Sequence, residues 1–332
     1  MFKSYILPRL IQWVIVIFVG VTVAFIVPRF TPGDPVQNTM SQLSALGSTN
    51  PEAVQKLEEV LKDLYGLRGN LLTQYLNFWK HLLQGDLGPS LSMFPTPVTQ
   101  VIRTSLPWTA GLLVISTLLG WLLGVILGTL SGYFSGRTWT KVLDGVIVCL
   151  YPIPYYVMAI TLVMLFAYVW PVLPLMGGAA IGVKPGLNWA FISSAIKHGF
   201  LPALSLLLIA VGWRYLSQRA LTSTIIASDY VVYAEAAALP QHKILFSYVL
   251  RNALLPQITD LALSLGVVFG GALVTEYVFS YPGMGQVLYT AILQGDFNLI
   301  MGVAIFSVVG IATAALFVDL TYPLFDPRIR YR

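Results

Sequence analysis

Long apolar stretches separated by shorter polar segments form the dominant pattern along the chain. Four stretches contain no charged residue and can cross a membrane as helices, because a hydrocarbon core about 30 Å thick takes about 20 residues at about 1.5 Å each. They are Leu10 to Val27, Leu106 to Leu130, Gly145 to Val169 and Phe297 to Val318. Two weaker stretches, Gly199 to Leu216 and Leu254 to Val278, contain one and two charged residues. The pattern predicts an all-α membrane protein with six transmembrane helices.

Basic residues at the ends of these stretches predict the orientation of the chain. Six spans place both termini on one side, and both ends are basic, with Lys3 and Arg9 at the start and Arg328, Arg330 and Arg332 at the end. The other loops on that side carry Arg137, Lys141, Arg214, Arg219, Lys243 and Arg251. By the positive-inside rule this side is the cytoplasm. The first stretch is too long for a signal peptide, so we expect a retained helix.

A segment of mixed polarity, residues 31–105, separates the first span (residues 1–30) from a core of five helices (residues 106–332). Two amphipathic helices are expected in it. The first has Asn50 as its cap, Pro51 at its start and an apolar face of Val54, Leu57, Leu61 and Leu64 before Gly66; the second covers Leu71 to Leu83 and stops at Gly85. Because each helix has a single apolar stripe, we expect a helical extracytoplasmic insertion on the outer surface of the bundle.

Composition and missing motifs exclude several classes of function. Hydrophobic residues make up 57% of the chain and charged residues 10%, too few charges for an ordinary soluble domain. The formal charge of +5 forms no basic stripe for nucleic acid, and the single cysteine, Cys149, excludes a disulfide framework. The scattered histidines offer no metal site, and the sequence has no phosphate-binding loop. We therefore expect no enzyme activity, metal or cofactor in this chain itself.

Small residues and prolines within two spans predict how those helices pack. Gly120, Gly124, Gly128 and Gly132 recur every four residues on one helix face. Such spacing favours close packing, either within this chain or against a partner subunit. Pro152 and Pro154 should bend the third span, because each removes a backbone donor.

A polar patch lies near the cytoplasmic end of the fifth span. It consists of Gln257, Asp260 and Ser264. Charges persist within spans only for a reason, so the patch is a candidate for a pathway or a partner-facing surface. The alternative is an acidic residue stabilised at the start of a helix.

The most informative segment joins the fourth and fifth spans, at about residues 217–251. Ser228 or Asp229 can cap a helix, alanines favour it and Pro240 ends it, which predicts a helix of about 11 residues. One face carries Tyr230, Tyr233, Ala234 and Ala237, and another carries Val232, Glu235, Ala236 and Leu239. The helix is too apolar for a solvated linker and too poor in basic residues for a lipid anchor. We expect it to dock into a groove of a partner protein.

Five motifs in order along the chain resemble those of permease subunits of binding-protein-dependent ABC importers, of the oligopeptide and dipeptide type. They are Pro32-Gly-Asp-Pro-Val36, Gln84-Gly-Asp-Leu-Gly-Pro-Ser90, the loop from Asp229 to Arg251-Asn-Ala-Leu-Leu-Pro256, Glu276-Tyr-Val-Phe-Ser-Tyr-Pro-Gly-Met-Gly285 and Asp326-Pro-Arg-Ile-Arg-Tyr331. They cover nearly the full length. The resemblance implies the type I permease fold, in the plasma membrane of a prokaryote.

The resemblance also implies partners. A second, homologous permease subunit would complete the pathway, two ATPase subunits would hold ATP and magnesium, and an extracytoplasmic solute-binding protein would deliver the solute. The coupling helix would consist of Asp229, Tyr230, Tyr233, Ala234, Glu235, Ala236, Ala237, Ala238 and Leu239. Relatives have glycine where Ala238 stands. Because alanine does not readily adopt positive φ, we expect Leu239 and Pro240 to make the turn instead.

The resemblance leaves the solute open. The turn formed by Tyr281, Pro282, Gly283, Met284 and Gly285 should lie at the outer surface and, with Asn77, form a rim that meets the solute-binding protein. Peptides and oligosaccharides both fit, and metal chelates are less favoured without a histidine cluster. An ion-coupled secondary transporter is the alternative, although neither internal repeats nor ionisable pairs within the spans are evident.

Overall fold

The computed structural model describes residues 5–30, residues 56–67 except 57, 61, 63 and 65, and residues 69–268 and 272–325. The helices are α1 (Leu7–Phe30), α4 (Leu71–Leu83), α5 (Val98–Tyr133), α6 (Thr138–Leu150), α7 (Tyr155–Val163), the π-helical segment η2 (Met164–Val169), α8 (Trp189–Ile226), α9 (Asp229–Ala236), α10 (Gln241–Lys243), the π-helical segment η3 (Ile244–Leu250), α11 (Arg251–Val267), α12 (Leu273–Val278), α13 (Met284–Gln294) and α14 (Phe297–Phe325). Within these ranges the chain has no strand, so the expected all-α class is confirmed.

Several expectations from the sequence lie outside the described residues. They are the motifs Pro32 to Val36 and Asp326 to Tyr331, the basic residues Lys3, Arg328, Arg330 and Arg332, and most of the helix expected after Asn50. The boundaries expected for the extracytoplasmic insertion stay predictions. The helix of the second span begins at Val98, within the segment assigned to that insertion.

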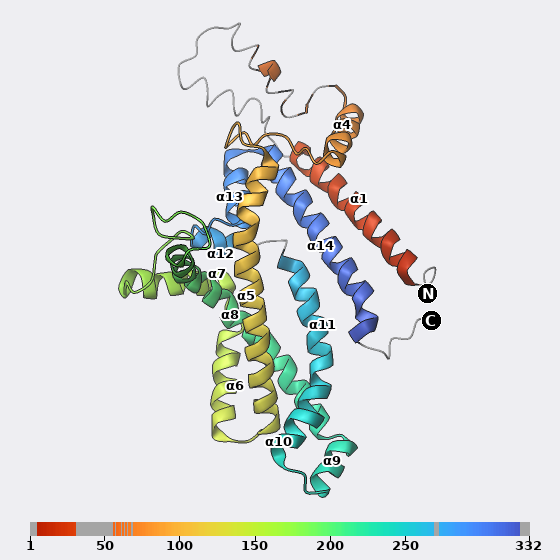
Figure 1. Cartoon of the computed structure of the whole chain (residues 1–332), viewed down its shortest axis with the longest axis vertical. Helices are drawn as coiled ribbons and strands as arrows, with labels where there is room; N and C mark the ends of the chain where they lie inside the picture. Colours follow the sequence, from red (N-terminus) through yellow and green to blue (C-terminus); the bar gives the residue numbers. More distant parts are fainter. Residues whose placement is uncertain are drawn as a thin grey trace.

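The long helices run side by side along the longest axis of the molecule (Figure 1). α5 packs along α8, α1 packs along α14, and α11 contacts both α14 and α5. α4 and α13 lie at one end of this bundle, which we call the α4 end, and α9 and α10 lie at the opposite end, the α9 end. The bundle therefore holds the Leu71–Leu83 helix and the loop between α8 and α11 far apart.

In the described part of the chain, α1, α5, α8 and α14 are each long and apolar enough to cross a membrane. The third expected span is broken, because α6 and the segment of α7 with η2 are bent by 98° relative to each other. Pro152 and Pro154 lie at this break, which confirms the predicted bend. The fifth expected span is divided: a continuous helix from Gln241 ends with α11 at Val267, and α12 begins again at Leu273. Six continuous spans are therefore not found among the described residues.

α5 and α8 pack closely through a row of glycines. A Cβ atom added to Gly124 would lie 2.6 Å from the Cβ of Arg214, and one added to Gly128 would lie 2.7 Å from the carbonyl oxygen of Tyr215. Gly120 and Gly132 approach α8 in the same way. The structure thus places this glycine face within the chain, which was one of the two alternatives.

Helix α4 covers the end of α1 and α14. The Asn70 side chain caps it by accepting the Thr73 N–H at 2.8 Å. Its aromatic side packs against α1 and α14 through Phe78 and Trp79. The side away from them exposes Leu71, Leu72, Leu76 and Leu83. The predicted second amphipathic helix is confirmed, with the expected bounds.

Candidate functional site at the α9 end

Helix α9 is shorter than the sequence suggested. It covers 8 residues, Asp229 to Ala236, and Ser228 stands at the N-cap position. The Ser228 hydroxyl donates to the Ile225 carbonyl of α8 and does not cap α9. Asp229 therefore supplies the negative charge that favours the helix start.

The turn after α9 corrects one expectation. Ala238 adopts φ +53°, so this alanine does take the left-handed conformation that usually favours glycine. The Leu239 N–H bonds the Ala234 carbonyl at 3.2 Å and the Ala238 N–H bonds the Glu235 carbonyl at 2.9 Å. These are the two hydrogen bonds of a Schellman motif, which usually has glycine at this position. The expectation that Leu239 and Pro240 make the turn is therefore wrong, because those bonds and the packing of Leu239 hold Ala238 in place.

One side of α9 is fixed to the bundle. Val231 and Ala234 are buried against Ile244 and Val249 at the start of the next helix. Tyr133 of α5, Ile225 and Ile226 of α8, Leu239 and Tyr248 complete this cluster. A displacement of α9 must therefore move α8 and the η3–α11 helix as well, because packed interiors do not deform freely.

The other sides of α9 are exposed. Asp229, Tyr230, Val232, Tyr233, Glu235, Ala236, Ala237 and Ala238 all lie on the surface. Tyr233 is 75% exposed, an unusual position for a large aromatic side chain. Of the docking face expected from the sequence, Tyr230, Tyr233 and Ala237 are available, whereas Ala234 is buried within the chain.

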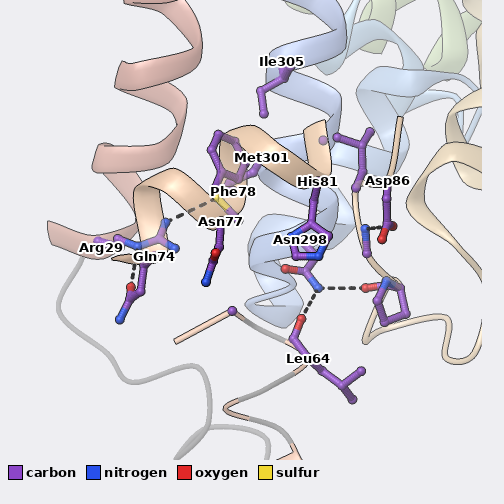
Figure 2. Close-up of a pocket in the computed structure, with 15 residues that line it drawn as sticks. Arg29, Leu64, Gln74, Asn77, Phe78, His81, Asp86, Asn298, Met301 and Ile305 are labelled. Atoms are coloured by element: carbon purple, nitrogen blue, oxygen red, sulfur yellow. Dashed lines mark hydrogen bonds between the residues drawn. The ribbon is translucent and has the colours of Figure 1, made fainter. Parts of the chain in front are cut away.

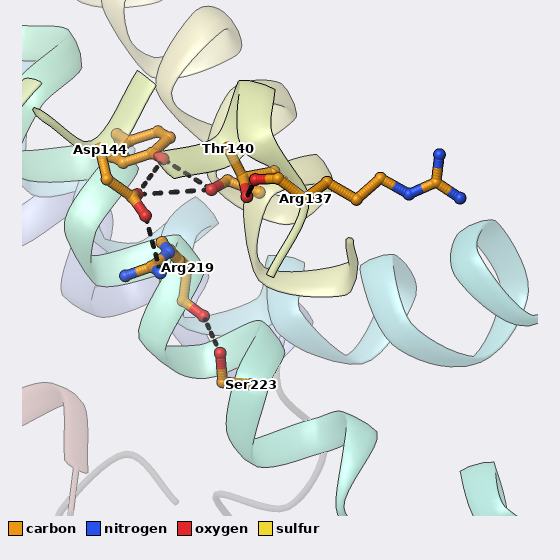
Figure 3. Close-up of polar contacts among 7 residues, drawn as sticks. Arg137, Thr140, Asp144, Arg219 and Ser223 are labelled. Atoms are coloured by element: carbon orange, nitrogen blue, oxygen red, sulfur yellow. Dashed lines mark hydrogen bonds and ion pairs between the residues drawn. The ribbon is translucent and has the colours of Figure 1, made fainter. Parts of the chain in front are cut away.

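A polar network ties α8 to α5 and α6 close to α9 (Figure 3). Arg219 of α8 forms an ion pair with Asp144 of α6, with 2.8 Å between Nη2 and Oδ2. The hydroxyl of Tyr215 donates to Asp144 and lies 2.7 Å from the Ser131 Oγ of α5. Asp144 was not among the residues predicted from the sequence, although a lone acidic residue between Lys141 and an apolar stretch is a usable signal.

The polar patch of α11 faces α8. Gln257 is buried and donates to Ser217 at 3.2 Å, and Ser264 accepts a hydrogen bond from Arg214 at 2.9 Å. Asp260 forms an ion pair with Arg214, with 3.4 Å between Oδ2 and Nε. Asp260 lies in the middle of α11, so the alternative of an acidic residue at a helix start is wrong.

Arg214 also requires a correction. From the sequence it was expected in a cytoplasmic loop, with no ionisable pair evident within the spans. The structure places Arg214 inside the continuous helix α8, buried between α5 and α11. The burial follows from Gly124, since the absence of a Cβ there leaves room for the base of the arginine side chain.

The expected outer rim is also corrected. Tyr281, Gly283, Met284 and Gly285 are buried, and only Pro282 is partly exposed. The turn folds inward around Glu276, whose carboxylate accepts the Gly285 N–H and the Thr109 hydroxyl, each at 2.7 Å. Because Tyr281, Gly283, Met284 and Gly285 are buried, the rim expectation is wrong for these four, and it stays a prediction for Pro282. Asn77 on α4 is exposed.

The Gln84 to Ser90 motif is fixed to the start of α14. Asp296 accepts the Ser90 hydroxyl at 2.6 Å and the Ser92 N–H at 2.9 Å, and it caps α14 by accepting the Leu299 N–H at 3.0 Å. The sequence analysis did not identify Asp296, although an aspartate before an apolar run is a typical helix cap. Among the described residues no group of three or more histidine, cysteine or acidic residues could hold a metal ion.

These features define a multi-pass helical membrane protein with an exposed helix fixed at one end of the bundle. Residues 120–331 match the family described as "Binding-protein-dependent transport system inner membrane component". The chain belongs to this family of membrane transport components.

The curated relatives agree with the family. The oligopeptide transport system permease protein AppB of Bacillus subtilis is 30% identical, with 99% of each chain covered. The oligopeptide permease protein OppB of Salmonella typhimurium is 28% identical, also with 99% of each chain covered. The di/tripeptide permease protein DppB of Pseudomonas aeruginosa is 28% identical, with 95% of each chain covered. The resemblance inferred from the five motifs is confirmed.

Proposed function

We propose that this chain is a permease subunit of an ATP-driven importer in a prokaryotic plasma membrane. A second permease subunit completes the pathway, two ATPase subunits bind at the α9 end, and a solute-binding protein delivers the cargo at the α4 end. The observation that carries the proposal is the two-sided character of α9. Its Val231 side is buried in the chain, and its Tyr230 and Tyr233 side is exposed. Exposed aromatic side chains on a rigid helix are typical anchors for a protein partner.

The orientation follows from charge. The loop between α5 and α6, the last part of α8 and α10 lie toward the α9 end (Figure 1). They carry Arg137, Arg219 and Lys243, so that end is cytoplasmic by the positive-inside rule. Both termini are then cytoplasmic, as six crossings require. In this proposal the broken third span and the divided fifth span each count as one crossing.

Movement of α9 reaches the bundle through two helices. α8 is 38 residues long, about 57 Å, and its last turns touch α9. η3 and α11 carry the other contact and lead to the Asp260 patch. ATP-driven closure of the ATPases would shift the two halves of the permease between inward-facing and outward-facing states. ATP and magnesium belong to the partner subunits, and this chain supplies the coupling surface.

The cargo we propose is a peptide. The support is the function of the relatives, which are oligopeptide and di/tripeptide permease proteins. Oligosaccharide import has no such support, and family membership does not favour an ion-coupled secondary transporter. Uptake assays with labelled oligopeptides and oligosaccharides in proteoliposomes containing the whole transporter would separate these cargoes.

The decisive test changes the exposed side of α9. Tyr233→Asp combined with Ala237→Asp should weaken ATPase binding by more than about tenfold and abolish uptake, because aromatic anchors carry much of the energy of such contacts. Thr138→Asp is the matched control, since it adds an acidic group at the exposed first residue of α6. ATPase subunits that co-purify with each variant, and ATP-dependent uptake, are the measurements. Full uptake by the double variant would overturn the proposal.

A further inference from the structure

A cavity of about 300 Å³ lies at the α4 end, outside the coupling site. Its walls come from the ends of α1 and α14, from α4 and from the loop Asp86 to Pro89 (Figure 2). The cavity lies at the end of the bundle opposite α9 (Figure 1). The coupling role proposed above for α9 does not use it.

One wall carries a fixed positive charge. The Arg29 guanidinium lies 3.5 Å from the centre of the Phe25 ring, and its Nη1 donates to the Phe25 carbonyl at 2.8 Å. Its Nε donates to the Gln74 side chain at 3.3 Å. These contacts hold the guanidinium against the cavity at a cost in conformational freedom that a solvated arginine would avoid. His81 and Asn77 add an imidazole and an amide to the lining.

The opposite wall carries a negative charge. Asp86 lies across the cavity from Arg29 (Figure 2). One carboxylate oxygen accepts the Gly88 N–H at 2.9 Å, which orients the side chain. Phe78, Met301 and Ile305 supply an apolar lining between the two charged walls. The cavity therefore suits a ligand with an anionic group, a cationic group and an apolar extension.

The position of the cavity indicates where such a ligand comes from. Arg29 is the first charged residue after the uncharged stretch from Leu10 to Val27, so it lies where α1 leaves the hydrocarbon core. Beside the cavity, α4 exposes Leu71, Leu72, Leu76 and Leu83. An amphipathic helix with exposed leucines at this level lies in the membrane interface. Lipid headgroups supply such zwitterions at that depth, and a peptide delivered at the α4 end is the competing source that the test below separates from them.

We propose that this cavity binds the headgroup of a zwitterionic phospholipid of the outer leaflet. The phosphate accepts hydrogen bonds from Arg29, and the ammonium group pairs with Asp86. Charge-assisted bonds from a guanidinium to phosphate are among the strongest that such a site can make. The acyl chains leave along the exposed leucines of α4. The lipid would fasten α4 to α1 and α14.

The test is lipid retention by the whole transporter, purified and reconstituted in nanodiscs with equal amounts of phosphatidylethanolamine and phosphatidylglycerol. Native mass spectrometry after mild delipidation should show phosphatidylethanolamine retained. Arg29→Gln should reduce this retention about tenfold, the loss of one charged contact worth about 1.4 kcal/mol. Lys80→Gln is the matched control, since it removes an exposed positive charge of α4 that does not line the cavity. Equal retention by the Arg29→Gln variant and the unmodified protein would overturn the proposal.

Asp86→Asn gives a second, independent result. It should leave total lipid retention similar and abolish the preference for phosphatidylethanolamine over phosphatidylglycerol, because only the former carries an ammonium group. If the Arg29→Gln variant does not fold, the Arg29→Lys, Asp86→Asn double variant replaces it. Its loss of the preference for phosphatidylethanolamine over phosphatidylglycerol would support the proposal, and an unchanged preference would overturn it. If inorganic phosphate or a short peptide displaces the bound lipid as effectively as added lipid does, the cavity is not a lipid site. Displacement by phosphate would indicate a site for a soluble anion, and displacement by the peptide would indicate a site for a cargo terminus.

Discussion

The Nε atom of Arg214 on α8 lies 3.4 Å from the Oδ2 atom of Asp260 on α11. The arginine side chain is 9% exposed and the aspartate side chain 39% exposed. The pair therefore joins two helices that both lead to α9, with its positive partner nearly withdrawn from solvent. A charge left alone in such a position is costly, so each partner depends on the other.

Removing one partner of this pair should destabilise the protein more than removing both. Asp260→Leu leaves the buried Arg214 unpaired and should lower the free energy of unfolding by about 2 kcal/mol. This loss is smaller than that expected on breaking a fully buried pair, because Asp260 is partly exposed. Arg214→Met with Asp260→Leu should recover much of that loss. Thermal unfolding of the purified transporter in detergent measures both. Additive losses in the double variant would show that the two charges do not interact.

The turn after α9 gives a prediction of the opposite sign. Ala238 has φ +53°, a conformation that costs an alanine about 1 kcal/mol and costs glycine almost nothing. Ala238→Gly should therefore raise the midpoint of thermal unfolding while transport is kept. Ala237→Gly is the matched control, because Ala237 has φ −77° and gains nothing from glycine. If both variants lost stability equally, strain at Ala238 would be disproved.

The sequence predicted the elements of this fold better than their contacts. Apolar length located α1, α5, α8 and α14, an apolar stripe ending before Gly85 located α4, and Asp229 with the alanines before Pro240 located α9. Those signals are local, since they depend on residues within one helix and its ends. The break after α6 was also predictable, because Pro152 and Pro154 act within their own helix.

What the sequence could not predict is which distant polar groups meet. Thr109 and Glu276 are 167 positions apart, and Ser90 and Asp296 are 206 apart. Nothing in either local pattern specifies its partner. The same limit led to Arg214 being assigned to a loop, because a charge near the end of an apolar stretch looks like a boundary until Asp260 is known to lie opposite.

The glycine face of α5 predicts a contrast between two positions in one helix. A Cβ atom on Gly128 would lie 2.7 Å from the Tyr215 carbonyl, whereas one on Gly111 would meet nothing within 4 Å. Gly128→Ala should lower the free energy of unfolding by at least about 1 kcal/mol by separating α5 from α8. Gly111→Ala should be neutral or stabilising, since alanine favours helix. Equal effects in thermal unfolding would contradict close packing as the role of Gly128.

The buried carboxylate of Glu276 carries the last prediction. Glu276 belongs to α12, and its carboxylate lies against the start of α13, where it accepts the Gly285 N–H and the Thr109 hydroxyl. Thr109 in turn accepts the Met284 N–H at 2.8 Å. Glu276→Gln keeps the shape but points an amide N–H₂ at one of these donors, so the free energy of unfolding should fall by about 2 kcal/mol.

Three further variants isolate the cause of that loss. Thr109→Ser keeps both hydrogen bonds and should be nearly neutral, whereas Thr109→Val removes both and should resemble Glu276→Gln. Glu235→Gln, on the exposed side of α9, controls for loss of a negative charge alone. Thermal unfolding should be paired with protease cleavage of the turn between α12 and α13, which is buried in the intact protein. If the Glu276→Gln variant unfolds at the same temperature as the Glu235→Gln variant and its turn stays protected from protease, the Glu276 carboxylate does not hold the turn inward.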